Sequence, residues 1–278
     1  MERHILRPIL PTIFLIILGI LIVHSSLIAI QKQVQEELAL KKIQFEQKLE
    51  KASKDKAKLK SFLMGMFEPS QNKDFVLVPS ELTTNLYKMY LREETLSAFQ
   101  EMQAYALTEG INLKIASATR NFDYQKSIWN NKWNGYMLVD GNDLSKSVPN
   151  ELERFKKILE YSAAPGTSRH HWGNDIDINN ANAEYFEGTL GAKEYEWLTL
   201  NARAFGFCQP YNLKGNNRAT GYNEEKWHWS YLPLAKTFTE QYKKIITSSD
   251  VKGFMGEEGV KNLNLINNYV LGINSDCL

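Results

Sequence analysis

Two short segments of the chain gather residue types that bind divalent metal ions. Residues 168–179 contain two histidines and two aspartates, namely His170, His171, Asp175 and Asp177. Residues 224–231 add Glu225 and His228. Neutral imidazole and carboxylate are ordinary zinc ligands, and a catalytic zinc site uses three protein ligands and leaves the fourth position to water. Together the two segments contain enough ligands for such a site.

The first segment predicts a bend followed by a strand. Alternating side chains place Asp175, Asp177 and Asn179 on one strand face, toward a site, and the intervening isoleucines on the other, toward the core. His170 precedes Asp177 by an odd number of residues, so the two cannot share a face of one straight strand. A bend at Gly173 would bring them together, because glycine adopts turn conformations readily.

The second segment predicts another strand. Its aromatic alternation puts Trp227 and Trp229 on the face opposite His228. Glu225 lies three residues before His228 and would face away in a straight strand, so we expect the strand to begin after it. On a preceding turn, this carboxylate could accept the proton of a zinc-activated water, whose pKa falls to about 7.

Three motifs in chain order resemble those of a known family. The pattern S-x-x-R with a trailing Gln is matched by residues 117–120 and Gln125, and E-x-W-H by residues 225–228. The pattern S-x-H-x-x-G-x-x-x-D is matched by Ser168, His170, Gly173 and Asp177. Over about residues 75–232 the chain resembles the D-alanyl-D-alanine carboxypeptidases of VanY type.

The resemblance implies a zinc-dependent peptidase that holds one zinc ion per chain. His170, Asp177 and His228 would be the ligands, Glu225 the base, and peptidoglycan stem peptides the substrate. The implied fold is the one shared with lysostaphin-type enzymes and the hedgehog signalling domain.

Three further residues are candidates for substrate contacts. By the same resemblance, Arg120 would hold the substrate's carboxylate or the oxyanion that forms as water adds, which suits a fixed charge with planar donors. A structural salt bridge is the alternative. Gln125 and Ser168 could bind substrate or could satisfy backbone groups near the bend.

Three positions near the motifs have more than one interpretation. Asp175 stands where many relatives carry Ala, and could orient a histidine ligand or repel an anionic substrate. Lys226 stands where relatives often carry Pro, and could steady ionised Glu225 or point to solvent. Only one of His170 and His171 should reach the metal, since adjacent extended residues face opposite ways, and the family spacing selects His170.

Several functions are compatible with these motifs. Carboxypeptidases that cut a D,D bond or an L,D bond share them with peptidoglycan endopeptidases, so the bond that is cut stays open. A zinc-containing peptidoglycan-binding module without catalysis is the rival from another class, because hedgehog relatives keep the metal for recognition. Glu225 favours a hydrolase, since a binder has no need of a carboxylate that is not a ligand. A structural envelope protein acting through its stalk is the third alternative.

The N-terminal part of the chain predicts a membrane anchor. Residues 9–30 are almost continuously apolar, and about 20 such residues cross a bilayer, whereas a cleavable signal peptide has about 7–15. Arg3 and Arg7 precede the span, so residues 1–8 should be a cytoplasmic tail and the remainder should lie outside the cytoplasm, in the periplasm or cell-wall space. A cleaved leader is the alternative.

Residues 31–70 predict a helical stalk. They are rich in Lys, Glu, Gln and Ala and contain no Gly or Pro before Gly65. Apolar residues form a partial heptad seam, interrupted by Lys41, that could pair two stalks into a weak homodimer: Val34, Leu38, Phe45 and Leu49. The alternative is a spacer.

The remaining residues, 71–278, predict one α+β domain. A helical pattern over residues 91–106 and a strand over residues 113–118 are followed by no regular strand–helix alternation, which indicates a small, largely antiparallel sheet flanked by helices. The net charge of +1 gives no support to a nucleic-acid partner. Cys208 and Cys277 could form a disulfide in an oxidising compartment, and neither has a partner at metal-ligand spacing.

Overall fold

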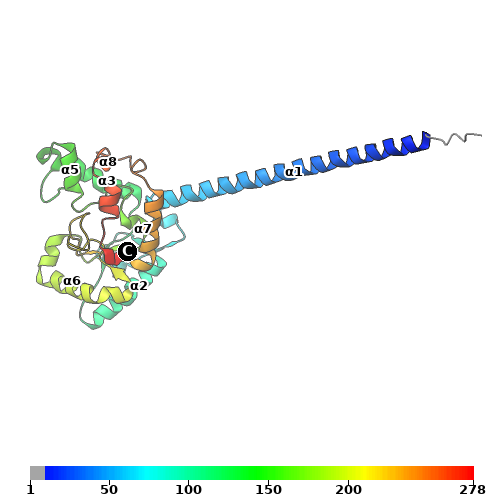
Figure 1. Ribbon diagram of the computed structural model, residues 1–278. Helices are drawn as coiled ribbons and strands as arrows, with labels where there is room; N and C mark the ends of the chain where they lie inside the picture. Colours follow the sequence, from blue (N-terminus) through cyan, green and yellow to red (C-terminus); the bar gives the residue numbers. More distant parts are fainter. Residues whose placement is uncertain (1–9) are drawn as a thin grey trace, which may run out of the picture. The chain divides into compact units, whose positions relative to one another are not determined.

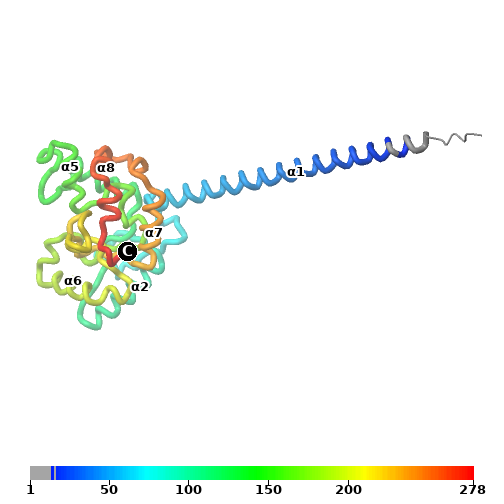
Figure 2. Tube along the Cα trace, viewed as in Figure 1, coloured from blue at the N-terminus to red at the C-terminus, as the bar shows by residue number. Residues whose placement is uncertain are grey.

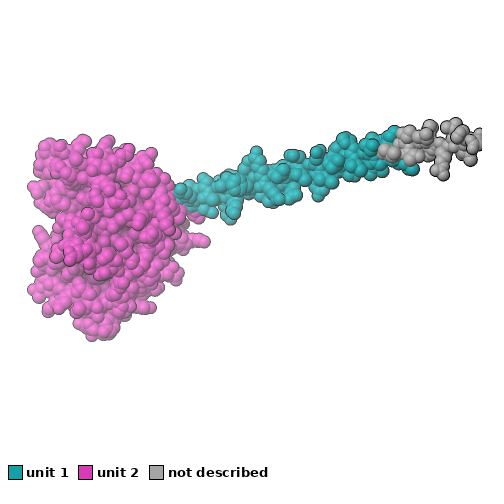
Figure 3. Space-filling model, in the orientation of Figure 1, with its two compact units in different colours: residues 1–57 teal, residues 58–278 magenta. Residues whose placement is uncertain are grey.

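A computed structural model of the protein describes residues 10–278 and divides the chain into two compact units, residues 1–57 and residues 58–278 (Figure 3). The predicted cytoplasmic tail, residues 1–8 with Arg3 and Arg7, lies outside the described residues.

The first long element is the uninterrupted helix α1, Leu10–Leu63 (Figure 1). Among the described residues it is the one helix long and apolar enough to cross a membrane, with a mean hydropathy of 1.6 in its apolar window. Its later turns carry Lys–Glu pairs one turn apart, such as Lys41 with Glu37 at 2.6 Å. Gly65 follows the helix with a left-handed φ of 73°, which ends it. The apolar part of α1 could therefore serve as the predicted anchor.

The second unit contains two small antiparallel sheets. One sheet pairs β1 with β2, and the other has the order β3-β4-β6-β5. The strands are β1 (Phe75–Leu77), β2 (Tyr90–Arg92), β3 (Ile115–Ser117), β4 (Asp175–Ile178), β5 (Phe207–Cys208) and β6 (His228–Tyr231). This confirms the predicted α+β class with a small antiparallel sheet flanked by helices.

The helices of this unit begin at polar capping residues where the sequence supplies them. Asn121 accepts a hydrogen bond from the backbone of Tyr124, and Asn150 does so from Glu153. The helices are α2 (Glu93–Thr108), α3 (Phe122–Trp133), α4 (Leu144–Ser147), α5 (Glu151–Ile158), α6 (Thr189–Asn201), α7 (Leu232–Ile245) and α8 (Gly259–Asn262).

The four-stranded sheet is apolar on one face only. Ile176, Ile178 and Trp229 pack with the apolar side chains of α2, including Phe99 and Met102. A second apolar cluster gathers side chains from α3, α5 and α7, among them Trp129, Phe155 and Tyr242. The opposite face of β4 and β6 carries polar side chains, and the candidate site lies on that face.

The C-terminal segment is fixed to the sheet. Figure 2 follows it in red from α8 to the C-terminus. Cys277 forms a disulfide with Cys208 of β5, across 69 positions of sequence, and both residues are buried. Asn274 donates its backbone N–H to Pro210 at 2.8 Å. The disulfide therefore closes a long loop that contains β6.

Reducing this disulfide should destabilise the domain. We expect the free energy of unfolding to fall by about 2–4 kcal/mol, because a cross-link over a long loop restricts the unfolded chain. Denaturant titration of the protein with and without reductant measures the change. The double variant Cys208→Ser/Cys277→Ser should have the stability of the reduced protein, and reductant should not change it. Equal stability of oxidised and reduced wild type would contradict the prediction.

Candidate metal centre

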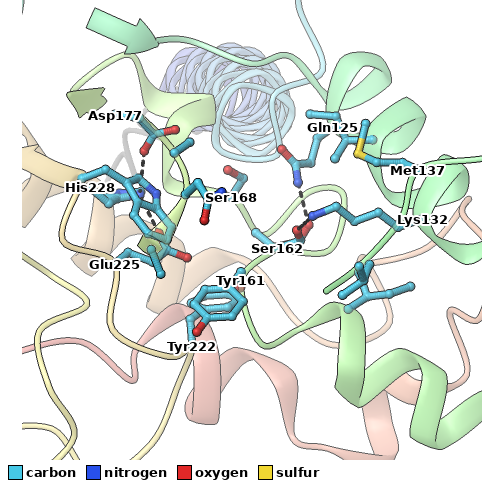
Figure 4. A pocket seen from close by; sticks show the side chains of 18 of the residues that line it. Gln125, Lys132, Met137, Tyr161, Ser162, Ser168, Asp177, Tyr222, Glu225 and His228 are labelled. Carbon is cyan, nitrogen blue, oxygen red and sulfur yellow. Dashed lines mark hydrogen bonds and ion pairs between the residues drawn. The ribbon is translucent and has the colours of Figure 1, made fainter. Parts of the chain in front are cut away.

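Antiparallel pairing of β4 with β6 brings the two predicted motifs together. The register sets Asp177 opposite His228 and Asp175 opposite Ser230. Candidate ligand atoms of His170, Asp177 and His228 all lie within 4.8 Å of one another, and the three residues are buried. Asp177 Oδ1 is 3.2 Å from His170 Nε2. It is 3.4 Å from His228 Nδ1, and Figure 4 shows these two side chains.

The bend predicted at Gly173 is confirmed. Residues Arg169–Trp172 form a single 3₁₀ turn, and Gly173 ends it with a φ of 77° in the left-handed region. A Cβ at this glycine would overlap the ring of Phe75. The bend turns the chain so that His170 faces Asp177 from outside the strand.

The outer nitrogens of both histidines are held by fixed acceptors. His170 Nδ1 lies 2.8 Å from the carbonyl oxygen of Ala118, and His228 Nε2 lies 2.7 Å from Asp175 Oδ2. If each of these nitrogens donates its proton, the other nitrogen of each ring presents a lone pair to Asp177. Among the described residues, His170 Nε2 and Asp177 Oδ1 have no hydrogen-bond partner.

These atoms fit a zinc ion. Buried lone pairs that face one another repel and lack partners, unless a cation lies between them. Burial lowers the pKa of His170, which favours the neutral ring. Burial alone would raise the pKa of Asp177, but His170 and Arg120 hold it below its usual range. Two imidazole nitrogens and one carboxylate form a ligand set that zinc enzymes use.

The surroundings of His228 also favour a cation. Burial alone would lower the pKa of His228, but its contacts with Asp175 and Glu225 raise it to about 9. Two carboxylates thus surround one ring, and a proton or a metal ion at Nδ1 would compensate their charge.

Asp175 lies behind His228 in a buried polar network. Its Oδ2 accepts from Arg169 Nε at 3.0 Å and from Ser230 Oγ at 2.5 Å, in addition to the contact with His228. Arg169 also donates to Thr239 of α7 at 3.0 Å, and the side chains of Arg169 and Asp175 are fully buried. Of the two interpretations of Asp175, this geometry supports the one in which it orients a histidine.

Glu225 lies on a turn before β6, as predicted. Its carbonyl accepts from His228 N at 3.2 Å, and its Oε2 is 3.1 Å from His228 Nδ1. Gln209 Nε2 donates to the same carbonyl at 3.1 Å, which fixes the turn. Burial raises the pKa of Glu225. A buried carboxyl group with a raised pKa beside a metal site is suited to proton transfer.

The three candidates for substrate contacts line one cavity of about 690 Å³ together with the predicted ligands. Arg120 follows β3, and its Nη2 is 3.9 Å from Asp177 Oδ2, so this cation borders the metal cluster. Gln125 donates from Nε2 to the carbonyl of Ala163 at 2.7 Å. Ser168 is buried and lies between the cluster and Gln125 in Figure 4.

His171 and Lys226 do not contact the cluster. His171 Nδ1 is 2.6 Å from the carbonyl of Arg120, its Nε2 accepts from Gly166 N at 3.1 Å, and burial lowers its pKa to about 3. It is a neutral structural residue. Lys226 Nζ pairs with Glu187 at 2.8 Å, so it does not steady Glu225.

Two orientation predictions were wrong. Asn179 has a φ of 61°, lies beyond the end of β4, and binds the backbone of Lys114 and Asn112, so it faces away from the site. Trp227 precedes β6 and lines the same cavity as His228, because strand alternation starts only at His228.

The sequence interpretation missed several residues of the cavity. The ring of Tyr211 packs edge-on against His228 with centroids 4.8 Å apart, and Tyr222 packs against Tyr211. Lys132 of α3 lines the opposite side. The two tyrosines lie in an irregular segment, where no sequence pattern indicates which way a side chain points. Lys132, in contrast, lies seven residues after Gln125, and in a helix that spacing places both on one face.

Residues 88–234 match the family model of VanY, D-alanyl-D-alanine carboxypeptidase. The chain belongs to this family. A putative carboxypeptidase of Bacillus subtilis, YodJ, is 29% identical over 174 residues, which cover 61% of this VanY-family chain and 56% of the relative. A D-alanyl-D-alanine carboxypeptidase of Enterococcus faecalis is 29% identical over 135 residues, covering 49% and 46%. The chain thus spans about half the length of these curated relatives.

Solved structures similar to this VanY-family chain include the LdcB LD-carboxypeptidase, at 26% identity with a TM-score of 0.46 over 71% of this chain and 80% of that one. Another is VanYB in complex with D-alanine-D-alanine, at 24% identity with a TM-score of 0.43 over 68% and 92%.

Replacing Asp175 should weaken metal binding without removing a ligand. We expect Asp175→Asn to lower zinc affinity by about 10–100-fold, because the amide lacks the negative charge that strengthens the hydrogen bond to His228 and so fixes its ring. Competition with a chromophoric chelator measures the affinity. Lys226→Ala, outside this network, is the control and should bind zinc as wild type does, while wild-type affinity in a folded Asp175→Asn protein would contradict the role.

Proposed function

We propose that the protein is a zinc-dependent carboxypeptidase that removes a D-amino acid from peptidoglycan stem peptides at the outer face of a cytoplasmic membrane. The observation that carries the proposal is the buried His170–Asp177–His228 cluster, with unpartnered ligand atoms, beside the non-ligand carboxylate of Glu225. Membership of the VanY family and the activity named for the Enterococcus faecalis relative support the same class of reaction.

Glu225 is proposed as the general base. A bound zinc ion would polarise the scissile carbonyl and lower the pKa of a water molecule to about 7. Glu225 would accept a proton from the attacking water and then give it to the departing amine, so that one water is consumed for each bond broken. The raised pKa of Glu225, caused by burial, suits a group that must both take up and release a proton.

Arg120 is proposed to stabilise the oxyanion that forms when water adds to the carbonyl. Its guanidinium borders Asp177, and its Nε has no hydrogen-bond partner among the described residues. A fixed donor without a partner in the free enzyme is available when negative charge develops on the substrate.

Glu225 also favours hydrolysis over a binding function. Burying a carboxylate is unfavourable unless its interactions compensate for the lost hydration. Glu225 is 5% exposed, and the only ion pair of its side chain within the described chain is with His228, a proposed ligand. A module that only bound peptidoglycan would gain nothing from this arrangement.

The membrane location is proposed from α1. Residues 9–30 would form the anchor after a short cytoplasmic tail, residues 31–70 the stalk, and residues 71–278 the peptidase domain outside the cytoplasm. Pairing of two stalks stays a prediction.

Hydrolysis can be tested with purified muropeptides and zinc, with the products identified by mass. We expect loss of a terminal alanine, and we expect Glu225→Ala to slow the reaction by about 10²–10⁴-fold while keeping bound zinc. Chelation should abolish activity and added zinc should restore it. A Glu225→Ala protein as fast as wild type would rule out this mechanism.

A further inference from the structure

Helix α3 presents a row of side chains to the cavity. Gln125, Ile128 and Lys132 follow at spacings of three and four residues and line it, while Trp129 and Trp133 of the same helix pack in the apolar core. Figure 4 shows Lys132 and Gln125 across the pocket from Asp177, Glu225 and His228. The cavity therefore has a second polar wall, opposite the metal centre.

Lys132 differs from the other basic residues that line the cavity. Arg169 is paired with Asp175 at 3.0 Å, and Lys157 with Asp140 at 2.7 Å. Arg120 lies 3.9 Å from Asp177. Within residues 10–278, Lys132 has no carboxylate within ion-pair distance, and its one hydrogen bond is to Ser162 Oγ.

An ammonium group in this position lacks a counter-ion. Lys132 is partly buried, and its ammonium has three donors, of which Ser162 uses one. Burial lowers the pKa of Lys132, Arg120 lowers it further, and Glu225 and Asp140 raise it. The charges of Arg120 and Glu225 thus act on Lys132, and an anion bound beside it would stabilise its charged form.

Gln125 adds an unpartnered acceptor to the same wall. It is 1% exposed, its Nε2 is held by the carbonyl of Ala163, and its Oε1 has no partner among the described residues. Lys132 and Gln125 are thus both tied to adjacent residues, Ser162 and Ala163. The wall offers ammonium donors beside an amide acceptor, which complements a carboxylate next to an N–H.

We propose that Lys132, supported by Ser162, binds the free C-terminal carboxylate of the substrate and so selects terminal residues for removal. The inference rests on the proposed carboxypeptidase function and specifies its substrate. In a linear peptide of α-linked residues, a carboxylate lies one residue after the scissile bond only at the chain end, whereas an internal position carries an uncharged amide there. On such a peptide, Lys132 would therefore favour removal of the terminal residue over cleavage at an internal bond.

The test compares two peptides that end in D-alanine and differ only in carrying a C-terminal carboxylate or a C-terminal amide. For wild type, kcat/KM should be about 30-fold or more higher for the acid, the effect of losing one partner of a desolvated charge pair. Lys132→Met should lower kcat/KM for the acid by that same factor, mainly by raising KM. It should leave kcat/KM for the amide unchanged. Lys132→Arg should recover part of the preference.

Two further variants keep the test decisive. Lys126→Met, on the same helix but outside the cavity lining, is the matched control and should keep the wild-type preference. If Lys132→Met does not fold, Ser162→Ala should show a smaller loss that is again confined to the acid. Zinc content and thermal melting establish that each variant is folded.

The two proposals fail in different ways. If wild type hydrolyses neither peptide, the proposed function is wrong. If wild type cuts acid and amide equally, or if Lys132→Met loses the same factor on both, the enzyme assignment stands and the role of Lys132 is overturned.

Discussion

The antiparallel pairing of β4 with β6 joins two segments that are far apart in the sequence, and the candidate metal centre depends on this register. The pairing sets Asp177 opposite His228 while Ile176 and Trp229 enter the core on the other face. A slip of one residue would exchange the two faces, burying carboxylates among apolar side chains. Packing of the apolar face therefore fixes the polar face, so the same interaction that stabilises the domain also assembles the site.

The buried Arg169–Asp175 pair also helps to position the residues of the candidate site. Such a pair contributes little net stability, because removing two charges from water offsets their attraction. Its geometry is nevertheless specific: Asp175 reaches the back of His228, and Arg169 reaches Ser230 of β6 and Thr239 of α7. The network links strand, helix and proposed ligand, and so restricts the rotation of the His228 imidazole before any metal binds.

Local sequence predicted the parts of this molecule whose geometry depends on neighbours in the chain. Strand alternation in β4, the bend at Gly173 and the turn at Glu225 follow from side-chain periodicity and glycine conformation. The family motifs then selected His170 over His171. The orientations of Asn179 and Trp227 were wrong because both lie just outside a strand, where alternation no longer applies. Tyr211 and Tyr222 reach the cavity through tertiary folding of an irregular segment, which no local pattern predicts.

The cavity has a cation without a carboxylate partner on the wall that faces the candidate metal centre. Asp177 and Glu225 lie with the proposed ligands, whereas Lys132 lies on the facing wall (Figure 4). The chain as a whole has a net charge of only +1, so any orientation of a charged peptide must come from local placement rather than from the global field. A cation bound among the ligands would leave Glu225 as the free anion on one side and Lys132 as the free cation on the other. A peptide with a terminal carboxylate would then bind more favourably with that carboxylate toward Lys132 than toward Glu225.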